Sequence, residues 1–301
     1  MASYFTWLRI PFLASSGLVA AASGLLYWKQ NELIYPRNIP LGARSNEGVP
    51  RPNQFGISDY EDLRVPTPDG ETLSAFFIRP SNKRQARKLT ILMFHGNAGN
   101  IGHRVPIAKV LEEQIGCNVF MLEYRGYGLS TGSPDEDGIN IDAQTAIDFI
   151  RNQEETRNDK IIVYGESIGG ACAIRLVANN QDAGDVAGLI LINTFTSIRK
   201  LIPSVMPPAK YIAGLCHQYW NSEEVLPQIT KIPVMFMSGL KDEIVPPAHM
   251  QQLYSISRAP KKIWRVFPNG MHNDTIAEPY FFDFVLEYVQ DVLGGQTMNP
   301  S

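Results

Sequence analysis

From residue 89 onward, short apolar runs alternate along the chain with longer stretches of mixed polarity. The apolar runs are rich in branched and aromatic side chains and predict buried strands at residues 89–94, 117–124, 160–165, 186–193, 232–239 and 262–267. The stretches at residues 137–153 and 168–180 predict helices. Because strands that alternate with helices pair in one sheet, the pattern predicts an α/β fold whose mostly parallel sheet has helices on both faces.

The segment before residue 89 has a different pattern. Residues 57–65 and 71–78 flank the turn sequence Pro66-Thr67-Pro68-Asp69-Gly70, which predicts a β-hairpin. A basic run follows between Arg79 and Lys88. Because it precedes a strand, it is expected at the amino-terminal end of the sheet, as a solvated loop or, alternatively, as a contact for anionic lipid.

The amino-terminal segment carries no charge between Arg9 and Lys29. A helix of residues 10–28 would extend about 28 Å, close to the roughly 30 Å of a bilayer core. The segment therefore predicts one transmembrane helix that binds the membrane through residues 10–28. The chain then divides into a membrane anchor at residues 1–30 and an α/β domain at residues 31–301.

A cleaved signal peptide is the alternative for this segment, because Ala20-Ala21-Ala22 resembles a small-residue cleavage site. An uncleaved anchor is favoured, since Leu25-Leu26-Tyr27-Trp28 continues the apolar run beyond that site. The chain is expected as a single-pass protein of the endoplasmic reticulum or another endomembrane, with the plasma membrane as the alternative. The charges on either side of the run are too balanced to predict its orientation.

An insertion at about residues 195–231, called the lid below, interrupts the alternation of strands and helices. It is rich in apolar and aromatic residues and is broken by Pro203, Pro207 and Pro208. It lies between two predicted strands, so it is expected to cover the carboxyl ends of the strands, where sheets of this kind build their sites.

Composition limits the classes of function. The chain has 301 residues and a net charge of −3, which gives no electrostatic basis for binding nucleic acid. Its three cysteines, Cys117, Cys172 and Cys216, are odd in number and lack metal-ligand spacing, which argues against a disulfide scaffold or a zinc site. No metal and no cofactor are implied.

The sequence Gly165-Glu166-Ser167-Ile168-Gly169 lies between a predicted strand and a predicted helix. A serine in such a turn is held in a strained backbone with its hydroxyl presented above the sheet. The two glycines let the strand and the helix approach each other closely. Ser167 is therefore the candidate nucleophile, and an ordinary turn serine is the alternative.

A serine hydroxyl needs a base, and the base needs an orienting acid. Asp242 follows the strand at 232–239, and His272 follows the strand at 262–267, in the order serine, acid, histidine. Glu243 is the nearest rival acid, whereas Asp274 is too close to His272 in sequence to orient its ring. His95, His103, His217 and His249 fit the role of base poorly because of their positions.

Acyl transfer also requires hydrogen-bond donors for the oxyanion. One donor is expected to be the backbone N–H of Ile168, directly after the nucleophile. The other is expected in the glycine-rich loop His95-Gly96-Asn97-Ala98-Gly99-Asn100, where the backbone N–H of Asn97 is the candidate. The alternative is that this loop only makes a turn.

Several of these stretches together resemble the α/β-hydrolase superfamily, and more narrowly its membrane-tethered bud-emergence-type branch, alongside the α/β-hydrolase domain-containing proteins. The resemblance extends from about Ile34 to Leu293 and rests on residues 94–99, 124–130, 164–170, 239–246 and 270–274. It implies that Ser167, Asp242 and His272 form a charge-relay triad. The superfamily includes esterases, lipases, acyl-protein thioesterases and peptidases, so the resemblance implies the chemistry better than the substrate.

The sequence thus predicts a serine hydrolase that cleaves an acyl ester or thioester of an amphiphilic lipid or acyl-protein through an acyl-enzyme. A peptidase or amidase with the same triad is one alternative. A non-catalytic scaffold or ligand receptor with the same fold is another, although its usual sign, a lost triad residue, is absent from the sequence.

Overall fold

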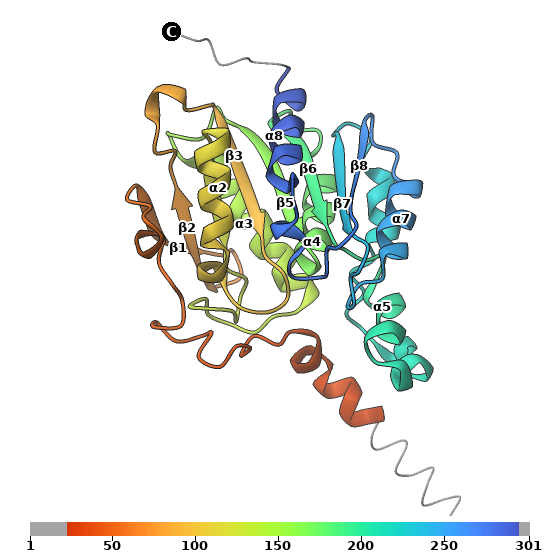
Figure 1. Cartoon of the computed structure of the whole chain (residues 1–301). Helices are drawn as coiled ribbons and strands as arrows, with labels where there is room; N and C mark the ends of the chain where they lie inside the picture. The colour runs from red at the N-terminus through yellow and green to blue at the C-terminus, as the bar shows by residue number, and fades with distance from the viewer. Residues whose placement is uncertain (1–22, 295–301) are drawn as a thin grey trace, which may run out of the picture.

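The computed structural model of the chain describes residues 23–294, which contain one eight-stranded sheet with the order β1-β2-β4-β3-β5-β6-β7-β8 (Figure 1). In chain order the strands are β1 (Tyr60–Pro66), β2 (Thr72–Ile78), β3 (Leu89–Phe94), β4 (Asn118–Leu122), β5 (Lys160–Glu166), β6 (Val186–Ile192), β7 (Val234–Gly239) and β8 (Lys262–Phe267). β1 and β2 form the predicted antiparallel hairpin, and β2 also pairs antiparallel with β4. The remaining pairs are parallel, which confirms the mostly parallel sheet.

Helices cover both faces of the sheet, as the alternating pattern predicts. Two of them, α2 (Val105–Ile115) and α8 (Phe281–Val292), lie on one face, whereas α3 (Glu136–Asn152) and α4 (Ile168–Asn180) lie on the other (Figure 1). Successive residues of the central strands point to opposite faces. In β3, Leu92 and Phe94 pack with α3 and α4, whereas Ile91 and Met93 pack with α2 and α8.

The lid contains no strand and folds into short helices between β6 and β7. These are α5 (Ile198–Val205), η4 (Pro207–Tyr211), η5 (Ala213–Leu215), α6 (Ser222–Val225) and η6 (Leu226–Gln228). Pro207 and Pro208 open η4 directly after α5, because a proline lacks the N–H that would continue the preceding helix. After β7 the chain enters α7 (Pro247–Ile256), whose first residue is a proline.

Residues 23–34 form a helix that lies beside the lid (Figure 1). It runs across the boundary predicted between residues 30 and 31. Among residues 23–294 no helix combines the length and the apolar character needed to cross a bilayer. Most of the predicted span at residues 10–28 lies outside the described residues.

Specific hydrogen bonds join this helix and the residue after it to the lid. The backbone N–H of His217 donates to Gln30 Oε1 at 2.8 Å. The Tyr35 hydroxyl donates to Gln218 Oε1 at 2.6 Å and accepts from Trp220 Nε1 at 2.8 Å. Burial raises the pKa of Tyr35, so its hydroxyl keeps the proton that it donates. Residues 23–35 and the lid therefore pack as one unit.

Arg125, in the motif at residues 124–130, fastens the hairpin to the rest of the fold. Its guanidinium is almost buried and lies 2.7 Å from Asp69 in the hairpin turn and 2.8 Å from Asp142 in α3. Two carboxylates from distant segments thus satisfy one buried charge, so this arginine has a structural role.

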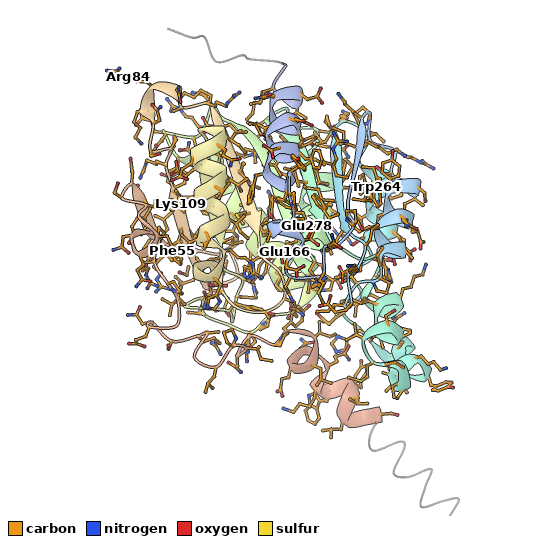
Figure 2. The ribbon with its side chains drawn as sticks, in the orientation of Figure 1. Phe55, Arg84, Lys109, Glu166, Trp264 and Glu278 are labelled. Carbon is orange, nitrogen blue, oxygen red and sulfur yellow. The ribbon has the colours of Figure 1, made fainter. Side chains whose placement is uncertain are left out.

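The basic run between Arg79 and Lys88 lies at the end of the sheet away from the lid, where Figure 2 labels Arg84. Arg79 pairs with Glu155 at 2.8 Å, and Lys83 pairs with Asp59 at 2.6 Å. The run therefore lies on the opposite side of the molecule from Ser167, as its place before β3 predicts.

Candidate active site

Ser167 occupies the sharp turn between β5 and α4. Its φ is 54° and its ψ is −118°, a backbone conformation that costs a non-glycine residue about 1–3 kcal/mol. The turn depends on the two flanking glycines. A Cβ on Gly165 would lie 2.4 Å from the Gly169 oxygen, and a Cβ on Gly169 would lie 2.4 Å from the Phe94 oxygen. The strained serine therefore exists only because strand and helix touch backbone to backbone.

The three predicted triad side chains meet beyond the carboxyl ends of β5, β7 and β8, on the half of the sheet where β6 lies between β5 and β7. His272 Nε2 lies 3.1 Å from Ser167 Oγ, and His272 Nδ1 lies 2.8 Å from Asp242 Oδ2. All three residues are buried. Because a carboxylate can only accept, Nδ1 carries the proton and Nε2 is left to accept from the serine hydroxyl.

The loop after β7 holds Asp242 and separates it from its rival. Asp242 Oδ1 accepts the backbone N–H groups of Ile244 at 2.9 Å and Val245 at 2.7 Å, which leaves Oδ2 facing the imidazole. Glu243 instead accepts the backbone N–H of His272 at 3.0 Å, and this hydrogen bond lowers the pKa of Glu243. Glu243 therefore stabilises the backbone of the histidine loop, whereas Asp242 contacts the imidazole ring.

Asn193, which sequence reasoning did not select, positions the histidine loop from the end of β6. Its Nδ2 donates to the His272 carbonyl at 3.2 Å and to Thr275 Oγ1 at 3.0 Å, and its Oδ1 accepts the Gly239 N–H at 2.9 Å. One buried amide thus joins the ends of three strands. The signal for it in the sequence is a single polar residue after an apolar strand, which is too common to identify a site.

The two predicted oxyanion donors both border the same space above Ser167. In the part of the chain that the structure describes, neither the Asn97 N–H nor the Ile168 N–H donates to a protein acceptor. The Asn97 loop is held from two sides. The Tyr127 hydroxyl lies 2.8 Å from Asn97 Oδ1, and the Asn97 side-chain amide donates to the Ile34 carbonyl at the end of helix 23–34.

His95 is the first residue of that loop, and its ring contacts Glu123 instead of the nucleophile. Its ring is 2% exposed, with Nε2 3.0 Å from Glu123 Oε1, and its carbonyl accepts the Tyr124 hydroxyl at 2.8 Å. His249 contacts Thr196 Oγ1 at 2.8 Å, and burial lowers the pKa of His249. Both histidines are packed elsewhere, which leaves His272 as the ring beside Ser167.

A cavity of about 430 Å³ opens above Ser167 and His272. This volume falls in the range of about 300–1,000 Å³ found for small-molecule sites. Most of its walls are apolar side chains from the lid and from helix 23–34, whereas polar groups gather near the nucleophile. Among these, Arg104 Nε lies 3.3 Å from Glu166 Oε2, so the two charges offset each other.

Comparison with known proteins connects this geometry to a family. Residues 85–229 match the family described as serine aminopeptidase, S33. This match includes the Asn97 loop, Ser167 and most of the lid, but it ends before Asp242 and His272.

Two relatives match nearly the whole chain. Protein bem46 of Schizosaccharomyces pombe is 42% identical over 288 residues, which cover 95% of this chain and 94% of that protein. The uncharacterized membrane protein YNL320W of Saccharomyces cerevisiae is 40% identical over 285 residues, which cover 93% of this chain and 97% of that protein.

Among solved structures, the Pyrococcus furiosus esterase Pf2001 is similar in fold. The TM-score is 0.64 at 19% identity, over 81% of this chain and 93% of the esterase. At this identity the likeness shows the α/β-hydrolase fold, and the chemistry has to be argued from the side chains of this chain.

Proposed function

Because the chain belongs to the bud-emergence-type branch of the α/β-hydrolase superfamily, which includes protein bem46, we propose that it cleaves acyl esters or thioesters of an amphiphile. The observation that carries the proposal is the continuous hydrogen-bonded series Ser167–His272–Asp242 at the base of an apolar cavity. A buried serine, a base of the correct tautomer and a fixed carboxylate are what nucleophilic acyl transfer requires.

In the first half of the reaction, Ser167 Oγ attacks the acyl carbonyl carbon while its proton passes to His272 Nε2. The carbonyl oxygen becomes an oxyanion, which the N–H groups of Asn97 and Ile168 stabilise. When the tetrahedral intermediate collapses, His272 returns the proton to the leaving alcohol or thiol. The acyl group remains on Ser167 as an ester.

In the second half, a water molecule replaces the leaving group. His272 takes a proton from the water as its oxygen attacks the acyl-enzyme, and then gives that proton to Ser167 Oγ as the ester breaks. The products are the free acid and the original serine. Asp242 takes no part in the proton transfers and stabilises the imidazolium of His272 that forms in each half of the reaction.

The cavity supports an acyl chain as the substrate group bound beside Ser167. Its walls are apolar side chains, and an apolar group gains about 25 cal/mol for each Å² removed from water. The head group or protein to which the acyl chain is joined would occupy the polar side, where Arg104 and Glu166 lie.

A peptidase or amidase is a second candidate, since the matched family is described as a serine aminopeptidase. An aminopeptidase needs a carboxylate that is available to the substrate's amino group. Glu166 borders the cavity, but its carboxylate already pairs with Arg104. The apolar cavity therefore favours the acyl ester or thioester.

We further propose that the chain is tethered to a membrane through residues 10–28. Two observations support the tether. The sequence contains the uncharged run, and the Saccharomyces cerevisiae relative YNL320W is named a membrane protein. An endomembrane such as the endoplasmic reticulum is the proposed location.

Labelling with a fluorophosphonate tests the hydrolase proposal. The full-length protein in detergent should react once, at Ser167, and Ser167→Ala should abolish the reaction while the melting temperature is retained. Ser238→Ala is a matched control, because Ser238 is also buried and its hydroxyl has no partner among the described residues. Labelling of the Ser167→Ala variant would refute the assignment of Ser167 as the nucleophile. A folded wild-type protein that never reacts would favour the alternative of a non-catalytic scaffold.

Comparing substrates then separates the two enzymatic candidates. Wild-type enzyme that has not been exposed to fluorophosphonate should hydrolyse acyl esters or acyl-thioesters faster than aminoacyl amides of equal leaving-group quality. Faster cleavage of the amides would replace the esterase proposal with the peptidase.

A further inference from the structure

One face of helix 23–34 is directed at the cavity. The residues of this helix that line it recur at intervals of three and four positions, the spacing of one helical face: Ser23, Leu26, Tyr27, Gln30, Leu33 and Ile34. The helix therefore contributes a wall to the space above Ser167, over its whole described length.

The opposite face of the helix changes character along its length. Leu25 is 63% exposed and Trp28 is 87% exposed, whereas the next outward positions, Lys29 and Glu32, form an exposed ion pair at 2.7 Å. The apolar outward residues thus adjoin the uncharged run that precedes them, and the charges lie farther from it. A helix that leaves the headgroup region of a bilayer for water has this order of residues.

The lid supplies the facing wall of the same cavity. Val205, Met206, Ile212 and Leu215 line it from α5 and the segments that follow. Val205 is 56% exposed and Met206 is 45% exposed, so apolar side chains continue from the cavity to its rim. On the helix, Tyr27 and Leu33 line the cavity and are 51% and 55% exposed, so the rim of the cavity is apolar on both sides.

The helix is also fixed to the catalytic machinery at its carboxyl end. The Ile34 carbonyl accepts the side-chain amide of Asn97, the residue proposed to supply an oxyanion donor. Gln30 and Tyr35 bind the lid through the hydrogen bonds to His217, Gln218 and Trp220. These hydrogen bonds therefore fix the position of the helix, and of the cavity wall that it forms, relative to Ser167.

We propose that helix 23–34 is a specificity-determining wall of the acyl site. It selects long acyl chains, which enter from the bilayer along the apolar rim, and it directs the acyl carbonyl to Ser167. This inference rests on the proposed function, because it takes the bound group to be an acyl chain.

The proposal predicts that sensitivity to the helix grows with acyl length. A short acyl group ends near Ser167 and does not reach the wall, whereas a long chain lies along it. Each methylene that the wall removes from water contributes about fourfold to kcat/KM. Loss of the space beside three or four methylenes would therefore lower kcat/KM by about 100-fold, on long chains alone.

Two adjacent leucines provide the experiment. Leu26→Trp fills the cavity, and Leu25→Trp places the same side chain on the outward face. Both full-length variants are compared with wild type in mixed micelles, using acetyl, butyryl, octanoyl and palmitoyl esters of 4-nitrophenol. Leu26→Trp should lower kcat/KM at least tenfold on the palmitoyl ester and less than twofold on the acetyl ester. Leu25→Trp should match wild type on every ester.

A second variant keeps the test decisive if the tryptophan prevents folding. Leu26→Ala should lower kcat/KM several-fold on the palmitoyl ester, because part of the wall is lost, and should leave the acetyl ester unchanged. Equal effects of the Leu26 variants at all chain lengths, or equal effects of Leu25→Trp and Leu26→Trp, would overturn the proposal. If wild type hydrolyses no ester and rejects fluorophosphonate, the proposed function itself fails.

Discussion

The substitution Asp242→Asn has an outcome that the hydrogen bonds of the loop dictate. Oδ1 of Asp242 accepts two backbone N–H groups, from Ile244 and Val245. An asparagine must therefore place its carbonyl oxygen there and turn its NH₂ group toward His272 Nδ1. Since NH₂ can only donate, Nδ1 has to accept, and the imidazole proton moves to Nε2. Nε2 then faces Ser167 with a proton and has no lone pair to take another.

The expected loss in kcat is about 10⁴-fold, the effect of holding a triad histidine in the wrong tautomer. This factor corresponds to about 5.5 kcal/mol of transition-state stabilisation. The fold should be preserved, because asparagine has nearly the size of aspartate and keeps both backbone hydrogen bonds.

Turnover of the acetyl ester and the rate of fluorophosphonate labelling measure the effect, with melting temperature as the folding control. Glu243→Gln is the matched comparison, because Glu243 lies next in sequence and its carboxylate accepts the backbone N–H of His272. Its turnover should fall by tenfold or less. A mild Asp242→Asn together with a severe Glu243→Gln would show that the wrong carboxylate was assigned.

Two other predictions follow from the contacts around the site. A chain that begins near Asn31 should keep hydrolysis of the acetyl ester, since Ile34 and Tyr35 remain, but should lose most activity on the palmitoyl ester; equal loss on both would mean that residues 23–30 are needed for the fold. The hydrogen bond from Arg125 lowers the pKa of Asp69 to about 2, so its contribution to stability is present above about pH 4 and is lost as the pH falls toward about 2. The Asp69 side chain is 36% exposed, so solvent screens this ion pair. Urea unfolding should therefore find Asp69→Asn about 0.2–1 kcal/mol less stable than wild type at pH 7. A difference that stays undiminished below about pH 2 would refute this account.

The sheet could be predicted because each strand and helix carries its own local pattern. Parallel strands place their carboxyl ends at one edge, so residues that follow Gly165, Gly239 and Phe267 had to come near one another. The sequence has no equivalent signal for Asn193. Its contribution depends on the ends of three strands meeting at one amide, which is a property of the assembled sheet.

Helix 23–34 could not be separated from the apolar run by pattern alone. The residues that face the cavity have helical spacing, but Gly24, Leu25 and Trp28 between them are also uncharged. The helix therefore appears apolar all round near its start, as a membrane span does, and its packing on the lid is hidden. The structure separates the two faces because the lid covers only one of them.

The contact between Tyr35 and Trp220 also has a consequence for biosynthesis. These residues are 185 positions apart, and the amino-terminal one leaves the ribosome first. The helix at residues 23–34 therefore has no complete lid to pack against until about three-quarters of the 301-residue chain has been made. Such a non-local contact forms late, because closing a long loop costs conformational entropy before the contact contributes any stabilising free energy. During that interval the lid is not yet available to Leu26 and Leu33. Under the proposed tether through residues 10–28, the hydrocarbon region of the bilayer would be the apolar environment closest to these side chains. If the chain is tethered as proposed, we expect this helix to bind the membrane while the chain is being made and to pack against the lid once the lid has been synthesised.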